Sequence, residues 1–216
     1  LTSLEDSFPL GREINNRVHY TGYVIEQTSI DIGVRDCAGE VLVSAGGGAV
    51  GTALLRTAVK ARNLLPDNAP RWRCLVGPNL AEATFQELKR HEHAGLVIER
   101  NRSDFPILLA RSRLSISQAG YNTVFEALAA RCRLVLVPFC VPGETEQSLR
   151  SALLEARGLA SVINPSELTA RGLMNVVTDS LKLPVPASAA FNFKGAAGCV
   201  AAIRSMLETN RSTRVS

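Results

Sequence analysis

The sequence predicts an α/β fold: a doubly wound, Rossmann-like parallel sheet of about six strands, covered by helices on both faces. Runs of roughly four to seven apolar or β-branched residues recur along the chain, and they are apolar on both faces, as strands buried inside a parallel sheet are. Segments with helical periodicity alternate with these runs. Glycines stand at two of the strand-to-helix junctions. This alternation is typical of parallel strands joined by helical crossovers.

The individual elements follow in chain order. A weak strand candidate at 18–25 precedes a stronger one at 40–45, whose sequence EVLVSA runs directly into glycines. The remaining strands are expected where apolar and β-branched residues gather, at 72–76, 95–98, 114–117, 134–139 and 160–163. Helices are expected at the periodic segments between and after them, over about 52–64, 80–92, 104–110, 123–130, 145–157 and 165–181.

Length and composition fit one large domain or two small ones. The chain has 216 residues, of which 46% are apolar and 20% charged, enough for a sizeable core and unlike a disordered chain. We expect an entry segment or interdomain linker over 1–16, the sheet domain over 17–185 and a helical tail over 186–216. Because the chain begins at Leu1 rather than Met, we expect it to be a fragment of a longer protein.

Charge, cysteine spacing and hydropathy argue against several classes of protein. The net charge of +4 is spread along the chain without a basic stripe, which argues against nucleic-acid binding. Five cysteines without a CxxC spacing support neither a disulfide framework nor a zinc site. No apolar stretch approaches the ~18 residues of a membrane helix. We therefore expect a cytoplasmic protein with reduced thiols and no metal site.

A glycine-rich loop follows the strand at 40–45. Gly46, Gly48 and Gly51 satisfy the GxGxxG pattern between a strand and a helix, where backbone N–H groups and the positive helix end can bind an anion. The pattern predicts a phosphate site, and a tight turn without a ligand is the alternative. A dinucleotide site also needs an acidic residue after the next strand, but that strand ends in VGP at 76–78. A nicotinamide cofactor is therefore not favoured.

A second candidate anion site follows the strand at 114–117. Gly120 turns the chain into a helix, so that the N–H groups of Asn122 and Thr123 and the Thr123 hydroxyl can donate to a phosphate. Two such sites on one sheet edge suit a diphosphate. Glu126 comes about one turn later among apolar neighbours, where a carboxylate needs partners, and two ribose hydroxyls would serve. The alternative for Glu126 is an ordinary acid that the helix dipole stabilises.

A third candidate group of polar residues follows the strand at 134–139. Its loop contains two prolines and a glycine, and Glu146 and Gln147 come directly after it. A carboxylate beside an amide supplies the donors and acceptors that several sugar hydroxyls require. The alternative is that Glu146 only stabilises the first turn of the next helix.

Together and in this order, these motifs resemble the carboxyl-terminal, donor-binding half of a GT-B fold glycosyltransferase. The likeness covers about residues 18–180. It is closer to the lipid II-forming N-acetylglucosaminyltransferases and related UDP-glycosyltransferases than to the plant UDP-glucosyltransferases. The residues that match the plant motif are Gly120, Tyr121, Asn122, Glu126, Glu146 and Gln147. At one position the chain departs from it, because the plant histidine near the phosphates is Gln118 here.

The resemblance implies a role for each motif in binding a UDP-sugar. Glu126 would hold the ribose hydroxyls. Arg100 and Asn101 follow the strand whose end pairs with uracil in the family, and Glu146 and Gln147 would contact the donor sugar. The residues expected to enclose the diphosphate are Gly46, Gly47, Gly48, Gly120, Tyr121, Asn122 and Thr123.

The implied function is transfer of a hexose, from UDP-N-acetylglucosamine or a similar donor, to an acceptor hydroxyl. Such enzymes use no obligatory metal or cofactor, because helix dipoles and positioned donors stabilise the leaving diphosphate. The family places the acceptor pocket and the catalytic base on an amino-terminal domain that this chain lacks. We therefore name no catalytic residue and expect the fragment alone to be inactive. The missing domain could also bring the enzyme to the inner face of the membrane.

Two other functions stay open at this point. UDP-N-acetylglucosamine 2-epimerases share the fold and the ribose carboxylate, but they also need catalytic carboxylates and a histidine in the cleft, which this sequence does not clearly supply. The remaining alternative is a nucleotide-binding module without catalysis.

Overall fold

The computed structural model describes residues 11–25, 39–45, 51–140, 145–186 and 191–213. The chain divides into two compact units. The larger unit, residues 26–188, contains the sheet, and the smaller combines 1–25 with 189–216.

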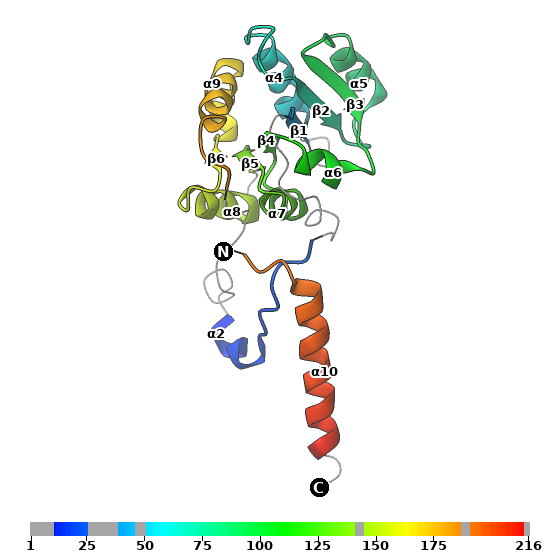
Figure 1. Ribbon diagram of the computed structural model, residues 1–216, viewed down its shortest axis with the longest axis vertical. Coiled ribbons are helices and arrows are strands. Elements are labelled where there is room, and N and C mark those ends of the chain that lie inside the picture. Colours follow the sequence, from blue (N-terminus) through cyan, green and yellow to red (C-terminus); the bar gives the residue numbers. More distant parts are fainter. Residues whose placement is uncertain (1–10, 26–38, 46–50, 141–144, 187–190, 214–216) are drawn as a thin grey trace. The chain divides into compact units, whose positions relative to one another are not determined.

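The larger unit is built on a six-stranded sheet in the order β3-β2-β1-β4-β5-β6, with every neighbouring pair parallel (Figure 1). Its strands are β1 (Val41–Ser44), β2 (Trp72–Val76), β3 (Leu96–Arg100), β4 (Leu114–Ser117), β5 (Arg133–Leu136) and β6 (Ser161–Val162). The register places Ser44 beside both Leu75 and Ser117, so the carboxyl ends of the three central strands lie level. The predicted doubly wound parallel sheet is confirmed.

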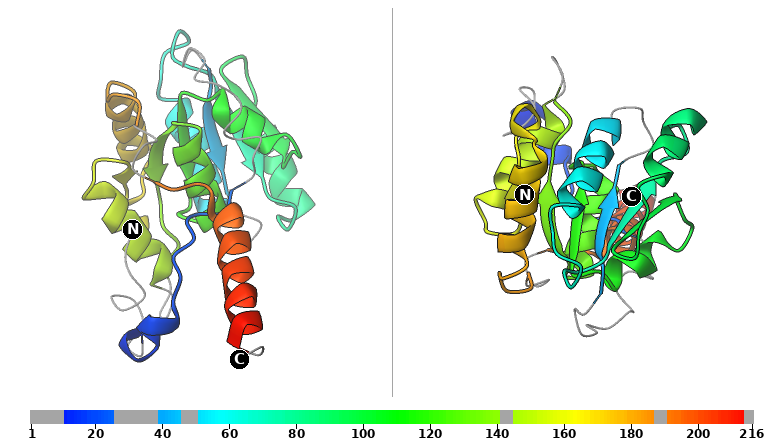
Figure 2. Two further views of the ribbon diagram at one scale, coloured as in Figure 1. Left: turned by 60° about the horizontal axis from the view of Figure 1, so that its bottom comes forward. Right: turned by 90° about the horizontal axis from the view of Figure 1, so that it is seen from above.

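Helices cover both faces of the sheet (Figures 1 and 2). One face carries α4 (Thr52–Arg62), α5 (Glu82–Lys89) and α9 (Ala170–Ser180). The opposite face carries α6 (Phe105–Ala110), α7 (Tyr121–Ala129) and α8 (Glu146–Glu155). This double cover explains the continuous apolar runs of the sequence, because Val41, Leu42 and Val43 of β1 are all at most 1% exposed.

Two element boundaries differ from the sequence prediction for clear physical reasons. The strand expected over 134–139 ends at Leu136, just before Pro138, which has no N–H for a further ladder bond. The single helix expected over 165–181 is a short 3₁₀ helix, η3 (Pro165–Glu167), followed by α9. Thr169 caps α9, since its hydroxyl accepts a hydrogen bond from the Gly172 N–H at 3.1 Å.

The smaller unit contains α2 (Gly11–Ile14), the 3₁₀ helix η1 (Asn15–Arg17) and α10 (Gly195–Thr213). The strand expected over 18–25 is wrong, because this segment forms no strand in the structure. Its backbone pairs with the segment before α10 instead of with a neighbouring strand. The Tyr23 N–H donates to the Asn192 carbonyl at 2.7 Å, and the Gly195 N–H donates to the Tyr23 carbonyl at 3.1 Å.

The third glycine of the GxGxxG pattern has a packing role. Gly51 stands directly before α4, and a Cβ on it would lie only 2.1 Å from the Cβ of Ala45, which follows β1. The strand end and the helix start therefore approach each other more closely than any side chain at position 51 permits. Gly46, Gly47 and Gly48, which we expected at a phosphate, lie outside the described residues.

We predict that Gly51→Ala destabilises the protein by about 1–3 kcal/mol, because the added methyl overpacks the contact with Ala45. Chemical denaturation of the variant beside the wild type measures the difference. Gly120→Ala is the matched control, since a Cβ there would meet no atom of the described residues within 4 Å. Equal stability of Gly51→Ala and the wild type would contradict the close approach.

Candidate functional site

The site lies where the strand order reverses. The chain runs outward in one direction from β1 to β3 and in the other from β4 to β6. Consequently α4 leaves β1 toward one face while α7 leaves β4 toward the opposite face (Figure 1). The two connections diverge, and a crevice opens beyond the carboxyl ends of these adjacent strands, where doubly wound sheets bind their ligands.

A cavity of ≈ 300 Å³ lies at this crevice, and we call it the α7 cavity. Its lining comes from the ends of β1, β2 and β3 and from the starts of α6 and α7. The lining residues are Ser44, Ala45, Gly77, Asn101, Phe105, Asn122, Thr123 and Glu126. The structure therefore brings together four predicted site residues, Asn101, Asn122, Thr123 and Glu126, that come from two separate strand ends.

Glu126 is held on the wall of this cavity by the amphipathic helix that carries it. Its neighbours on α7, Phe125 and Ala127, are at most 1% exposed and anchor the helix to the sheet. Glu126 itself is half-buried on the cavity side. A half-buried carboxylate can accept hydrogen bonds from two hydroxyls of one ligand, one at each oxygen.

The amino end of α7 has no side-chain cap. Gly120 is its N-cap and supplies no capping side chain, so the first N–H groups of the helix, including those of Asn122 and Thr123, have no intrahelical acceptor. Gly120 has φ −62° and ψ 140°, a conformation that any residue adopts. A Cβ there would also meet no atom of the described residues within 4 Å. The packing of these residues therefore does not require a glycine at position 120.

A second cavity, of ≈ 180 Å³, lies on the other side of the strand reversal. Its lining comes from the start of α4, the end of β4, the loop after β5 and the η3 segment. The lining residues are Ala53, Leu54, Gln118, Val137, Pro138, Phe139, Cys140, Pro165 and Leu168. Gln147 lies beside this loop, because its Oε1 accepts a hydrogen bond from the Phe139 N–H at 3.0 Å. Glu146 forms an ion pair with Arg150. Glu146 and Gln147 line neither of the two cavities.

Arg100 and Tyr121 lie outside the α7 cavity lining. The Arg100 guanidinium donates to the carbonyls of Gly77 at 3.3 Å and Leu80 at 3.1 Å, and it stacks 4.3 Å over the Phe85 ring. It also pairs with the Glu82 carboxylate. Arg100 thus holds the loop after β2, which supplies Gly77 to the cavity. Tyr121 packs against Phe125 with the ring centroids 4.7 Å apart.

Sequence reasoning missed four residues of the α7 cavity. Ser44, Ala45 and Gly77 follow or end strands, so the rule that ligands bind at strand ends could have found them. Phe105 had no such signal, because it begins a helix of six residues whose position against α7 is a tertiary feature.

Comparison with known proteins identifies the family. Residues 42–196 match the glycosyltransferase family 28 C-terminal domain. The chain belongs to glycosyltransferase family 28. The matched range covers the sheet from the second residue of β1 onward and both cavities, so this family 28 domain is the GT-B carboxyl-terminal half that the motifs predicted.

Individual relatives agree with this assignment. An uncharacterised glycosyltransferase of Methanopyrus kandleri, MK0977, is 24% identical over 194 residues, which cover 85% of this chain and 53% of that protein. The UDP-N-acetylglucosamine–N-acetylmuramyl-(pentapeptide) pyrophosphoryl-undecaprenol N-acetylglucosamine transferase of Sinorhizobium medicae is 27% identical over 110 residues, 46% of this chain and 29% of that enzyme. The chain thus spans about half or less of these relatives.

Solved structures share the fold. The crystal structure of Acinetobacter baumannii MurG superposes with a TM-score of 0.56 and 22% identity, covering 68% of this chain and 45% of that one. The calicheamicin glycosyltransferase CalG4 gives a TM-score of 0.52, also with 22% identity, over 68% of this chain and 35% of that one. At this identity the likeness to both structures shows the GT-B half-fold alone.

The described part of the family 28 domain and its flanking segments contains no group of three or more His, Cys, Asp or Glu side chains that could hold a metal ion. None of the helices within the described ranges is long and apolar enough to cross a membrane.

The cysteines of the family 28 chain are expected to differ sharply in reactivity. Burial raises the pKa of the Cys74 thiol to about 12, so at about pH 8 it is protonated as well as inaccessible. Cys132 is also buried, whereas Cys140, beside the second cavity, and Cys199 are exposed. Peptide mass spectrometry after brief iodoacetamide treatment should find modification at Cys140 and Cys199 but not at Cys74 or Cys132. Labelling of Cys74 as fast as Cys140 in the folded protein would contradict the fold.

Proposed function

We propose that this chain binds the donor of a glycosyltransferase that moves a hexose from UDP, with UDP-N-acetylglucosamine as the leading donor, to an acceptor hydroxyl. The observation that carries the proposal is the α7 cavity. It combines a half-buried carboxylate, two side-chain amides and the uncapped amino end of a helix at the strand reversal of the sheet. These groups are complementary to a ribose, a base and a phosphate, respectively.

The arrangement suggests how UDP would lie. Asn101, after β3, offers its backbone carbonyl and its side-chain amide to the uracil edge, since its N–H already donates to the Val76 carbonyl at 3.0 Å. Phe105 lines the same cavity, where its ring would pack against the base. Glu126 would accept the two ribose hydroxyls. The diphosphate would then extend from the ribose toward Gly120 and the first N–H groups of α7, where the helix dipole favours negative charge.

The donor sugar would occupy the second cavity region. From the α7 cavity the diphosphate leads across Gly120 toward Gln118 and the loop after β5, whose Phe139 N–H binds the Gln147 side chain. Gln147 keeps its amide N–H groups for a sugar hydroxyl, and Glu146 stands next to it. The choice of N-acetylglucosamine rests on the Sinorhizobium relative, whose name specifies UDP-N-acetylglucosamine as donor.

The acceptor and the catalytic base would belong to a further domain. This chain spans 53% of the Methanopyrus relative and 29% of the Sinorhizobium enzyme, so an amino-terminal half is part of the proposal. The role left to this chain is to bind the donor and to stabilise the UDP leaving group through fixed backbone dipoles. Because the Sinorhizobium relative acts on an undecaprenol-linked acceptor by name, we place the enzyme at the inner face of the membrane through that missing half.

Ligand titration of the chain tests the donor proposal. Calorimetry should show that UDP binds in preference to ADP and NAD, because uracil and ribose contacts act together at the α7 cavity. Equal affinity for the three nucleotides would remove the uracil site. For the full-length protein, UDP release that requires an acceptor indicates transfer, whereas conversion of the donor without UDP release indicates an epimerase.

Glu126 variants test the ribose contact. If the carboxylate accepts two hydroxyls, Glu126→Ala should lower UDP affinity at least about tenfold, and Glu126→Gln, which keeps one acceptor oxygen, should lower it less. Both losses should shrink with 2′,3′-dideoxy-UDP, since this ligand lacks the hydroxyls. An equal loss for UDP and dideoxy-UDP would show that Glu126 does not contact the ribose.

Gly120→Ala separates ligand binding from stability. The substitution fits the backbone conformation and meets no neighbour among the described residues, so it should leave stability unchanged or raise it by about 0.4–1 kcal/mol. The methyl would instead stand in the space through which the diphosphate is proposed to pass. We expect a large loss of UDP affinity without a lower melting temperature, measured by calorimetry and thermal denaturation. Unchanged UDP affinity would place the diphosphate elsewhere.

A further inference from the structure

Arg150, on α8, is a buried cation that no sequence motif indicated. Only 7% of the residue is exposed, yet it lies in the first half of a helix whose start reaches the proposed sugar site. Its Nη1 donates to the carbonyl of Ala119, and its Nη2 pairs with the Glu146 carboxylate one turn earlier. The guanidinium carbon is also 5.8 Å from the centre of the Tyr121 ring. One side chain therefore contacts both the β4–α7 turn and the start of α8.

The bond to Ala119 fixes the orientation of the turn that precedes α7. Ala119 is fully buried, so its carbonyl needs a partner inside the protein, and Arg150 supplies it. In a trans peptide the carbonyl and the N–H of the next residue point in opposite directions. With the Ala119 carbonyl directed at Arg150, the Gly120 N–H is directed away from α8. Arg150 thus sets the direction of the first donor of the proposed diphosphate turn.

The ion pair fixes the second half of the donor site. The Glu146 side chain is 68% exposed, whereas that of Arg150 is 8% exposed. An exposed glutamate at a helix start samples several rotamers, and a buried partner held by a second bond restricts it. Arg150 therefore holds the Glu146 carboxylate in one place beside Gln147, where the donor sugar is proposed to lie.

An ordinary stabilising ion pair does not account for all these contacts. Glu146 and Arg150 are four residues apart on α8, a spacing that stabilises many helices through exposed pairs. In such a pair both side chains remain in water. Here the guanidinium is buried and spends a second donor on a carbonyl of a different element, the turn before α7. Burying a guanidinium is costly, and its ion pair with Glu146 and its bond to the Ala119 carbonyl offset that cost.

We propose that Arg150 is a positioning residue of the donor site, which holds the Ala119–Gly120 peptide for the diphosphate and the Glu146 carboxylate for the donor sugar. The proposal rests on the proposed function, because it assumes that a UDP-sugar binds here. Arg150 would not contact the donor itself, and it would act through the turn and through Glu146.

Three ligands of increasing length test the proposal with the 216-residue chain. Uridine probes only the α7 cavity, UDP adds the turn, and UDP-N-acetylglucosamine adds the sugar. For Arg150→Met we expect UDP affinity to fall at least about tenfold while uridine affinity stays within about twofold, because the base and ribose contacts are untouched. Glu146→Ala should leave UDP affinity within about twofold and weaken only UDP-N-acetylglucosamine.

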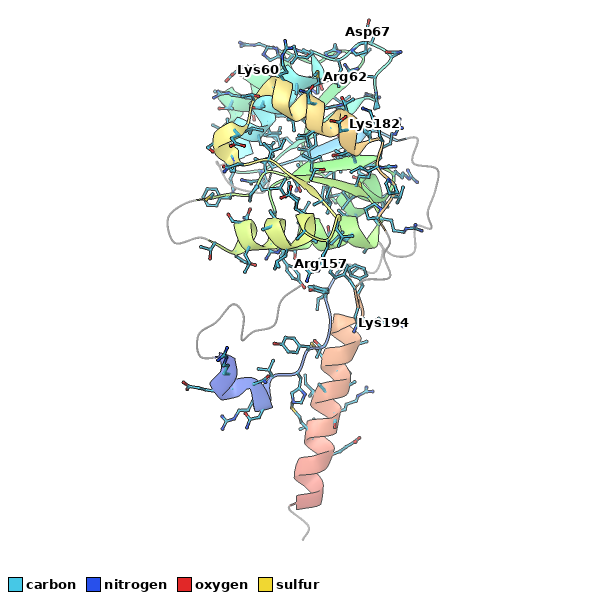
Figure 3. All side chains as sticks on the ribbon, turned by 90° about the vertical axis from the view of Figure 1, so that its left-hand side faces the viewer. Lys60, Arg62, Asp67, Arg157, Lys182 and Lys194 are labelled. Atoms are coloured by element: carbon cyan, nitrogen blue, oxygen red, sulfur yellow. The ribbon has the colours of Figure 1, made fainter. Side chains whose placement is uncertain are left out.

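Arg157→Met is the matched control. Arg157 lies just after α8 (Figure 3) and, like Arg150, donates to a backbone carbonyl, that of Leu153 at 2.8 Å, but it is exposed and remote from the turn. The Arg157→Met substitution removes the same charge without touching the turn, so it should leave all three affinities unchanged. Arg150→Lys, which keeps one donor for Ala119, should restore part of the UDP affinity. It also serves as the test variant if melting curves show that Arg150→Met is unfolded.

The outcomes separate the two proposals. A wild-type chain that binds neither uridine nor UDP overturns the proposed function, and the role of Arg150 with it. If the wild type binds both, but the Arg150 variants lose uridine and UDP by the same factor or lose neither, the donor site stands and the positioning role is wrong. A selective loss of UDP over uridine, absent in Arg157→Met, supports Arg150 as the residue that orders the turn.

Discussion

The reversal of strand order between β1 and β4 is the constraint on which the rest of this site depends. The helices that follow these two adjacent strands, α4 and α7, leave toward opposite faces of the sheet (Figure 1). The two connecting segments therefore diverge, and a crevice forms beyond the carboxyl ends of β1 and β4. Both cavities, the uncapped amino end of α7 and the carboxylate of Glu126 are located by this single topological feature.

Two glycines at this edge serve different purposes. Gly51 permits the start of α4 to approach the end of β1, so it belongs to the packing of the fold. Gly120 has a backbone conformation that any residue adopts, and a Cβ there would meet no atom of the described residues within 4 Å. The packing of the described residues therefore does not require a glycine at this position.

Two arginine side chains next to the site form hydrogen bonds with other parts of the protein. Arg100 is engaged by the carbonyls of the loop after β2, and Arg150 by Ala119 and Glu146. The groups proposed to face a diphosphate are instead backbone N–H donors and the Thr123 hydroxyl. Such dipoles need no reorganisation when charge develops on a leaving group. The arginines contribute indirectly, because they fix the loops that present those donors.

The amino-acid sequence by itself determined the sheet and half of the residues that line the α7 cavity. Buried parallel strands must be apolar on both faces, and the residues after them must lie at one edge, so Asn101, Asn122, Thr123 and Glu126 could be assigned to one cavity without coordinates. The tertiary structure alone decided the rest. It paired the backbone of 18–25 with residues 192–195, so that no strand forms there, and it turned Arg100 toward the loop after β2. It also brought the Arg150 guanidinium to the Ala119 carbonyl. Such contacts depend on how helices pack, and the distance between two residues along the sequence does not reveal them.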